Sequence, residues 1–191
     1  MKSKRNAIAL SAVLLTLCLA LVAGATFALF GQDFDNTVTV SSGGISADVT
    51  FENVKTFSME KETEPQGTFD LGGTAALNGT NELVLQNIVP GDRAEVNLTI
   101  QNNQESIAVK YRITVTVEGA YESNLLVSVD GEGVTSGTPS AWKNLAKGAS
   151  AAAAVSVGLD ENAGNDMMNV SGTVKITVEL IQGNAAEEDL T

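Results

Sequence analysis

Alternation of apolar and polar residues with a period of two is the feature that most constrains the fold of this chain. Along residues 109–117 every second position is apolar, as Val109, Tyr111, Ile113, Val115 and Val117. A β-strand points successive side chains to opposite faces, so this pattern predicts a strand with one buried face. Shorter runs of the same kind lie at residues 45–51, 96–101 and 174–180.

Turn signals separate these runs and complete the fold prediction. The run at Glu82–Val89 ends at Pro90-Gly91-Asp92, where proline presets one turn torsion and glycine permits positive φ. Strands are also expected at Leu125–Val129 and Ala151–Leu159, although the alanine run in the latter could form a short helix, and Glu60–Gly67 is expected to be a loop. Many strands, frequent turns and no long amphipathic helix predict an all-β, antiparallel two-sheet sandwich of jelly-roll type.

Residues 1–28 have the layout of a helical signal peptide. Three basic residues lie among the first five, an uncharged apolar run spans Ala7–Val22, and small residues follow. Cleavage is expected between Ala28 and Leu29, with a competing site after Ala25; an uncleaved anchor is the alternative, because the run nearly reaches the length of a membrane span. The chain is therefore expected to be exported from a prokaryotic cell and to keep no stable membrane insertion after cleavage.

Residues 29–44 are expected to form an N-terminal strand and a flexible linker before a sandwich at 45–183 and an acidic, polar tail at 184–191. The strand would place its apolar residues on one face: Phe30, Phe34, Val38 and Val40. No hairpin partner is obvious for it, and Ser41-Ser42-Gly43-Gly44 would act as the linker. Such a strand could add to an open sheet edge of another subunit, and pairing within its own domain is the alternative.

Composition argues against several kinds of chemistry. The formal net charge of −12 disfavours binding to nucleic acid and anionic lipid. The chain has no histidine and one cysteine, Cys18, which lies in the predicted signal peptide. The usual zinc ligands and the histidine base of a catalytic triad are therefore missing, and we expect neither an enzyme nor a cofactor.

Two residue groups could be mistaken for binding sites. The stretch 160–166 is the densest cluster of oxygen ligands, but it does not match an EF-hand, and an acidic turn with at most weak calcium binding is the favoured interpretation. The large aromatic residues Trp142, Tyr111 and Tyr121 could form a carbohydrate platform, but packing in the core or at an edge is expected instead.

Several segments, in order along the chain, resemble the TasA and camelysin family of matrix-fibre proteins. They are Gly24–Phe30, which is similar to leaders cut by the dedicated signal peptidase SipW, then Asn36–Val49, Asn87–Asp92, Gln101–Asn103 and Ala108–Val117. The resemblance is most specific at the leader and at the turn Pro90-Gly91-Asp92. It implies a jelly-roll domain at the cell surface, joined to its neighbours by donor-strand exchange in the best-known branch of the family.

The expected function is that of an exported structural protein in a cell-surface or biofilm-matrix fibre. Its expected partners are further copies of the chain and, during export, the dedicated signal peptidase. A monomeric secreted adhesin or ligand-binding sandwich is the alternative. A camelysin-like metallopeptidase is a distant third, because the chain has no histidine to hold zinc.

Overall fold

The computed structural model describes residues 36–42, 45–64, 66–79, 81–103, 107–122, 124–164 and 170–183, and it describes side chains from residue 45 onward. Within these ranges every regular element is a strand, and the strands form two antiparallel sheets. The prediction of an all-β, two-sheet sandwich is therefore confirmed. The predicted signal-peptide helix, the cleavage site at Ala28 and Leu29, and the tail at 184–191 lie outside the described residues.

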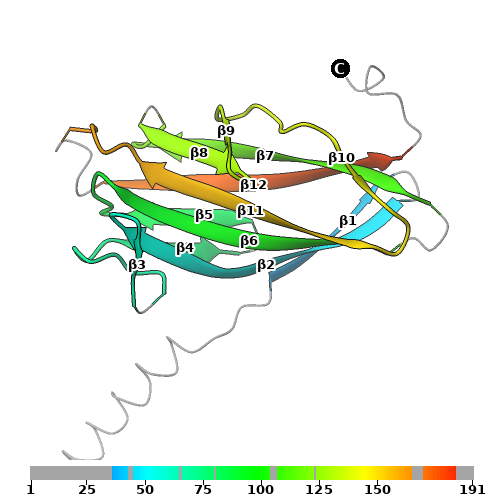
Figure 1. Ribbon diagram of the computed structural model, residues 1–191, viewed down its shortest axis with the longest axis horizontal. Coiled ribbons are helices and arrows are strands. Elements are labelled where there is room, and N and C mark those ends of the chain that lie inside the picture. Colours follow the sequence, from blue (N-terminus) through cyan, green and yellow to red (C-terminus); the bar gives the residue numbers. More distant parts are fainter. Residues whose placement is uncertain are drawn as a thin grey trace, which may run out of the picture. The chain divides into compact units, whose positions relative to one another are not determined.

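The larger sheet has seven strands. Six follow the order β1-β2-β6-β11-β8-β9, and β3 pairs with the end of β2. Their bounds are β1 Asn36–Ser42, β2 Ile45–Ser58, β3 Lys61–Glu62, β6 Asp92–Asn102, β8 Leu125–Val129, β9 Glu132–Val134 and β11 Ser150–Leu159. Figure 1 shows β2, β6 and β11 running beside one another in this layer.

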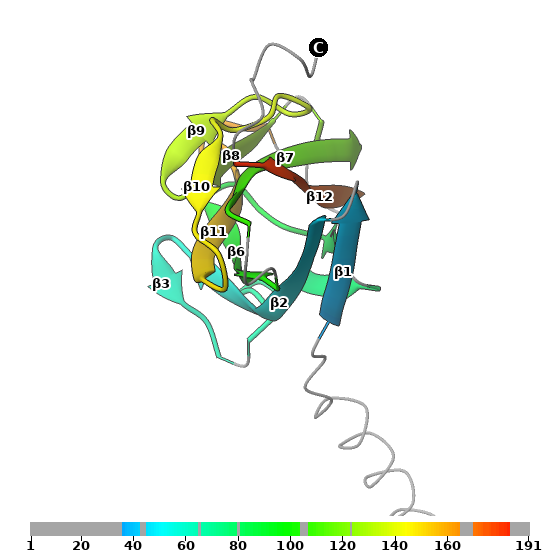
Figure 2. The same ribbon diagram turned by 90° about the vertical axis from the view of Figure 1, so that its right-hand side faces the viewer.

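The smaller sheet has five strands in the order β10-β7-β12-β5-β4. Their bounds are β4 Thr74–Asn78, β5 Glu82–Gln86, β7 Val109–Gly119, β10 Lys143–Leu145 and β12 Ser171–Gln182. Figure 2 shows β7 and β12 on the opposite side of the sandwich from β2. The chain passes repeatedly from one sheet to the other, as from β5 to β6 to β7 to β8, which is the jelly-roll-like feature of the connectivity.

The core lies between the two sheets and follows from the period-two pattern. Residues alternate between buried and partly exposed along all of β6 and along most of β7. Leu98 and Ile100 from one sheet and Ile113 and Val115 from the other are at most 1% exposed. Burying a side chain of this size stabilises a fold by about 1.5–3 kcal/mol, so the two inward faces hold the sheets together.

The strand predicted at Ala151–Leu159 is confirmed, and two other local predictions are corrected. The alanine run does not form a helix, because residues 150–158 pair with residues 93–101 of β6, and sheet pairing outweighs the helix propensity of alanine. The strand predicted at Glu82–Val89 ends at Gln86, because the next residue, Asn87, has a φ of 54° and leaves the extended conformation. The predicted loop Glu60–Gly67 contains the two-residue strand β3.

Candidate assembly edge

β1 is an edge strand of the seven-stranded sheet. It pairs with β2 in an antiparallel register that includes Val38 with Val49 and Val40 with Ala47. Among the described strands β2 is its only strand partner. Val49 and Ala47 are at most 1% exposed, so β1 lies alongside the part of β2 that faces the core.

Within a single copy, the strand pairs in its own domain, which is one of the two alternatives that the sequence left open. The expectation that the N-terminal segment lacks a hairpin partner is wrong for Asn36–Ser42, which pairs within its own chain. The predicted linker is also too long, because Ser41 and Ser42 belong to β1, and the sandwich includes Asn36–Ser42 as well as residues from 45 onward. Of the predicted assembly residues, Val38 and Val40 lie in β1, whereas Phe30 and Phe34 lie outside the described residues.

The described residues of β1 pair with β2 from Ile45 to Phe51. On the other side of β2, the register between β2 and β6 shifts at a bulge between Phe51 and Val54. Beyond the bulge β2 continues to Ser58 and pairs with the two residues of β3. A bulge bends a strand, so it separates the part of β2 that pairs with β1 from the part that pairs with β3.

The predicted turn at Pro90-Gly91-Asp92 is present. Gly91 has a φ of 89°, a conformation that favours glycine, and the Asp92 backbone N–H donates to the Val89 carbonyl at 3.0 Å. The Gly91 N–H donates to the Leu159 carbonyl at 3.0 Å, which ties the turn to the end of β11. The structure therefore gives this turn a structural role where β6 begins.

The buried carboxylate of Asp92, at the start of β6, bonds to Ser58 at the end of β2 and to Val89 in the β5–β6 connection. Its Oδ1 accepts a hydrogen bond from Ser58 Oγ at 2.8 Å, its Oδ2 accepts one from the Val89 N–H at 3.0 Å, and Ser58 Oγ accepts one from the Asp70 N–H at 3.1 Å. Asp92 is 3% exposed. Burial raises the pKa of this carboxyl, the hydrogen bonds from Val89 and Ser58 oppose the rise, and the nearby Asp70 adds to it.

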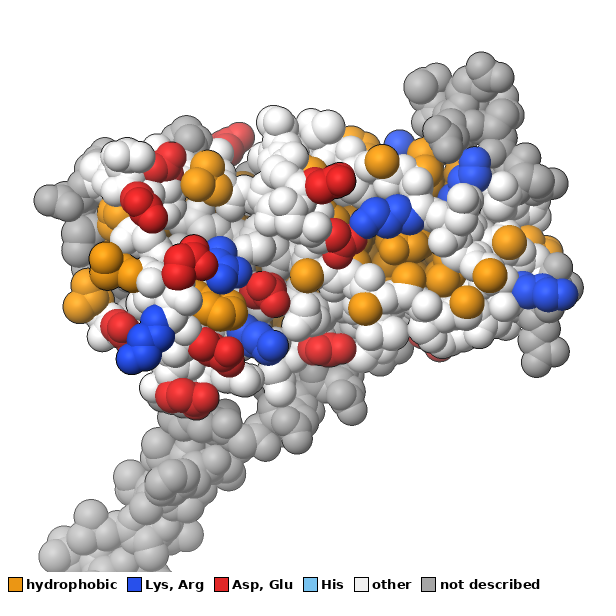
Figure 3. Space-filling model, viewed as in Figure 1, with side chains coloured by type: hydrophobic (Ala, Val, Ile, Leu, Met, Phe, Trp, Pro, Cys, Tyr) orange, Lys and Arg blue, Asp and Glu red, His pale blue; other side chains and the backbone are white. Residues whose placement is uncertain are grey.

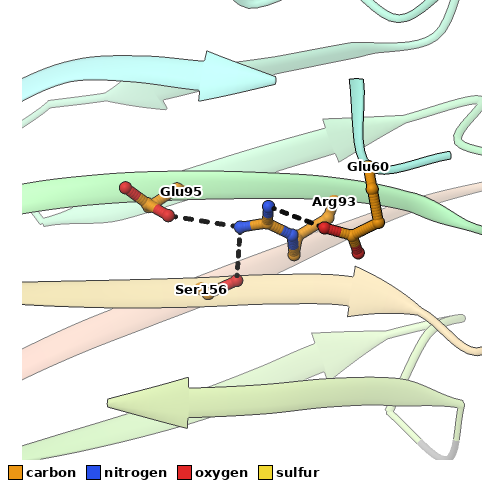
Figure 4. A network of polar contacts seen from close by, with 4 residues as sticks. All are labelled: Glu60, Arg93, Glu95 and Ser156. Carbon is orange, nitrogen blue, oxygen red and sulfur yellow. Dashed lines mark hydrogen bonds and ion pairs between the residues drawn. The ribbon is translucent and has the colours of Figure 1, made fainter. Parts of the chain in front are cut away.

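A groove of about 710 Å³ lies on the outer side of the larger sheet, between β6, β11 and the β8–β9 hairpin. Arg93 at its edge is held by Glu60 at 3.3 Å, Glu95 at 3.2 Å and Ser156 at 3.4 Å (Figure 4). Its guanidinium also lies 4.1 Å from the centre of the Phe57 ring. The charge of Arg93 is therefore already paired within the chain.

The lining of this groove also includes the carboxylates of Glu122 and Glu161. Figure 3 shows acidic and basic side chains interspersed at the left-hand end of this face.

The aromatic residues take the packing roles that were predicted. Tyr111 is 4% exposed and Tyr121 is fully buried, with its hydroxyl donating to the Val170 carbonyl at 2.8 Å. A Cβ added to Gly172 would lie 2.7 Å from Tyr121 Cδ2, so glycine at that position allows the ring to pack. Trp142 is half-buried, and the Arg112 guanidinium lies 4.5 Å from its ring centre.

The acidic stretch that begins at Asp160 is a turn in its described part. Asp160 Oδ1 accepts hydrogen bonds from the Asn162 backbone N–H at 2.8 Å and from its side-chain Nδ2 at 3.1 Å. In the described part of the chain, no group of three or more acidic or cysteine side chains is placed to hold a metal ion. None of the described residues forms a helix long and apolar enough to cross a membrane.

Comparison with known proteins gives no family. No family model and no curated protein matches the sequence. Two solved structures are similar at a low level. The secreted serine protease VesC from Vibrio cholerae has 8% identity and a TM-score of 0.29, over 73% of this chain and 35% of that one. A β-glucosidase from Kluyveromyces marxianus has 13% identity and a TM-score of 0.30, over 83% of this chain and 20% of that one.

Neither similarity carries an argument about activity, because both TM-scores are low and this chain spans only 35% and 20% of the other proteins' lengths. The features that bear on function are therefore in this chain's own geometry, above all its sheet edges.

Sequence reasoning missed one set of residues at those edges. Ser136 and Ser140, in the connection between β9 and β10, hydrogen-bond to the backbone of β7. The only sequence signal is the turn-rich composition of Ser136-Gly137-Thr138-Pro139-Ser140, which does not specify a partner.

Proposed function

We propose that this protein is an exported structural subunit that forms a cell-surface or matrix fibre by exchanging β1 between neighbouring copies. The role is not catalytic. The observation that supports it best is the position of β1 at a sheet edge, paired only with β2 among the described strands. Export is supported by the signal-peptide layout of residues 1–28.

Exchange would conserve the contacts of β1. All seven residues of β1 pair with β2, and the same pairs can form with β2 of a second copy. The opened and closed forms would then differ little in energy, so a high local concentration of subunits could favour the exchanged form.

The connection between β1 and β2 also favours exchange. Only Gly43 and Gly44 join the paired residues Ser42 and Ile45. A short connection of this kind must open into an extended chain when β1 moves to another subunit, and short hinge loops promote domain swapping. Glycine permits both the turned and the extended backbone at little steric cost.

A reversible disulfide across β1 and β2 tests the proposal. Thr39 and Asp48 are paired residues, and antiparallel partners lie at a Cα distance suited to a disulfide. In a chain carrying Cys18→Ala, Thr39→Cys and Asp48→Cys, oxidation of the monomer should block fibre formation, and a reductant should restore it. Fibres are measured by light scattering and negative-stain electron microscopy.

The matched control carries Thr37→Cys with Asp48→Cys, which are diagonal rather than paired positions and should not form the bond. Fibres of ordinary yield from the oxidised, locked monomer would contradict exchange of β1. A reduced protein that stays monomeric at all concentrations would contradict the fibre itself.

A monomeric ligand-binding protein is the second candidate, and the groove beside Arg93 favours it. Because Arg93 is paired and the lining includes Glu60, Glu122 and Glu161, this open surface would suit a cationic or hydroxyl-rich ligand better than an anion. Binding of oligosaccharides or basic peptides to a protein that remains monomeric would support this candidate over the fibre.

A further inference from the structure

The β7 edge is paired differently from the β2 edge, which pairs with the strand β1. β10 pairs only with Tyr111, Lys110 and Val109, whereas β7 continues to Gly119. Without another partner the remaining edge would expose unpaired N–H and C=O groups, which can bind an extended strand of another chain. The edge from Ile113 to Val117 is therefore a strand-binding surface that needs a cover.

The segment Ser136–Ser140 supplies this cover with backbone and side-chain groups. The Gly137 N–H donates to the Val115 carbonyl, and the Ser140 N–H donates to the Ile113 carbonyl, both at 2.8 Å. In return, Ser140 Oγ accepts from the Ile113 N–H at 3.0 Å, and Ser136 Oγ accepts from the Val117 N–H at 2.9 Å. Serine hydroxyls thus take the place of backbone carbonyls.

The segment Ser136–Ser140 is not itself a β-strand, so a further strand cannot pair with it in a regular ladder. Gly137 has a φ of 78°, the Thr138 N–H donates back to the Thr135 carbonyl at 2.9 Å, and Pro139, opposite Thr114, has no N–H. Proline and a positive φ both interrupt the regular ladder that a further strand would require. The segment therefore pairs with β7 without presenting a new edge of its own.

We infer that the β7 edge at Ile113–Val117 is a second, latent pairing edge that would bind the same edge of another copy, and that Ser136–Ser140 keeps it closed. The biological meaning of this inference rests on the proposed fibre. In that fibre, the segment Ser136–Ser140 restricts strand exchange to the β2 edge. Growth would then proceed through one edge per subunit, whereas an open β7 edge would add lateral contacts.

The first part of the test asks whether the serines protect the edge. Ser136→Ala with Ser140→Ala removes the two acceptors and leaves the backbone unchanged. We expect hydrogen exchange at the Ile113 and Val117 amides to rise about tenfold, since each loses one hydrogen bond. Thr135→Ala with Thr138→Ala is the matched control, because these exposed side chains lie in the same connection, and it should leave both amides protected.

The second part asks whether the weakened cover, which keeps only its two backbone hydrogen bonds to Val115 and Ile113, lets the edge pair with the same edge of another copy. It uses the full chain with β1 locked to β2 by the oxidised Thr39→Cys and Asp48→Cys pair. The double serine variant of this locked protein should form dimers in sedimentation velocity, whereas the locked parent and the threonine control stay monomeric. Unchanged amide exchange, or faster exchange in a protein that stays monomeric, would overturn the inference. Polymerisation of the locked parent alone would instead count against exchange of β1, so the two failures are distinguishable.

Discussion

The edges at β1 and β7 belong to different sheets. At both, the backbone N–H and C=O groups of an edge strand need partners, and the two edges obtain them in different ways. The edge of β2 is covered by a whole strand that pairs residue by residue and is joined by two glycines. The β7 edge from Ile113 to Val117 is covered by an irregular segment that uses two serine hydroxyls as acceptors. A regular strand can be replaced by the same strand of another copy, but an irregular cover cannot be copied by a simple extended chain. The edge formed by β1 and β2 is therefore suited to strand exchange, whereas the edge of β7 is suited to staying closed.

The largest effect in this comparison is expected from truncating one apolar residue at each edge. Ile113→Ala in β7 removes a side chain that is 1% exposed, and it should lower the free energy of unfolding by about 2–5 kcal/mol. Val38→Ala in β1 should cost less than about 1.5 kcal/mol, because a removable edge strand contributes little to the stability of the remaining sandwich. Urea denaturation of both variants measures the difference, and equal costs would show that β1 is as integral to the fold as β7.

A second prediction concerns how β2 stays in place when β1 leaves. Asp92 holds Ser58 at the far end of β2, so Asp92→Ala should destabilise the domain by about 2–3 kcal/mol through the loss of partners for Ser58 and Val89. Chemical denaturation at one pH measures this loss. A loss of stability below about 0.5 kcal/mol would mean that the hydrogen bond between Asp92 and Ser58 does not hold β2 in place.

The same carboxyl predicts a dependence on pH. Because burial raises the pKa of Asp92 above its ordinary value of 3.8, the folded state binds this proton more tightly than the unfolded state. The contribution of Asp92 is therefore most favourable below about pH 3.8 and is lost as the pH rises through the pKa in the folded state. Thermal melts from about pH 3 upward should show this loss for the parent relative to Asp92→Asn, whose side chain does not titrate. A constant difference between the two across that range would contradict the raised pKa.

The smallest expected change in stability comes from Thr114, which lies in β7 opposite Pro139. The hydroxyl of Thr114 is buried, opposite Pro139, and has no hydrogen-bond partner among the described residues. Thr114→Val should stabilise the domain by about 1 kcal/mol, since it replaces an unsatisfied polar group by an apolar group of similar shape. Thr116→Val on the same strand is the control and should change stability less. A destabilised Thr114→Val would show that this hydroxyl has a partner in solution.

The sequence predicted the parts of the fold that depend on local periodicity. The strand with inward Ile113, Val115 and Val117 lies where the alternation placed it, and so does the turn at Pro90-Gly91. The environment of Asp92 was not predictable, because its partner Ser58 is 34 residues away and no periodicity connects the two. The same limit applies to Ser136 and Ser140, since a hydroxyl that replaces a backbone acceptor leaves no pattern in the sequence.

The pairing of β1 shows a different limit. The alternation in Asn36–Ser42 indicates a strand, but any open edge could satisfy its backbone, so the sequence alone left the choice of partner open. The structure selects β2 of the same chain, in a register that places Val38 opposite Val49. The register is what makes exchange with a second copy a defined and testable event.

The most direct test of the central claim is to trap the pairing inside assembled fibres. The chain carrying Cys18→Ala, Thr39→Cys and Asp48→Cys is assembled under reducing conditions, oxidised as fibres, then denatured and separated by size without reductant. If β1 pairs with β2 of the neighbouring subunit, the disulfides join different chains, and a ladder of covalent dimers, trimers and higher multimers will be seen. If the denatured fibres instead release only monomers with an internal disulfide, β1 stays in its own subunit and the account is contradicted.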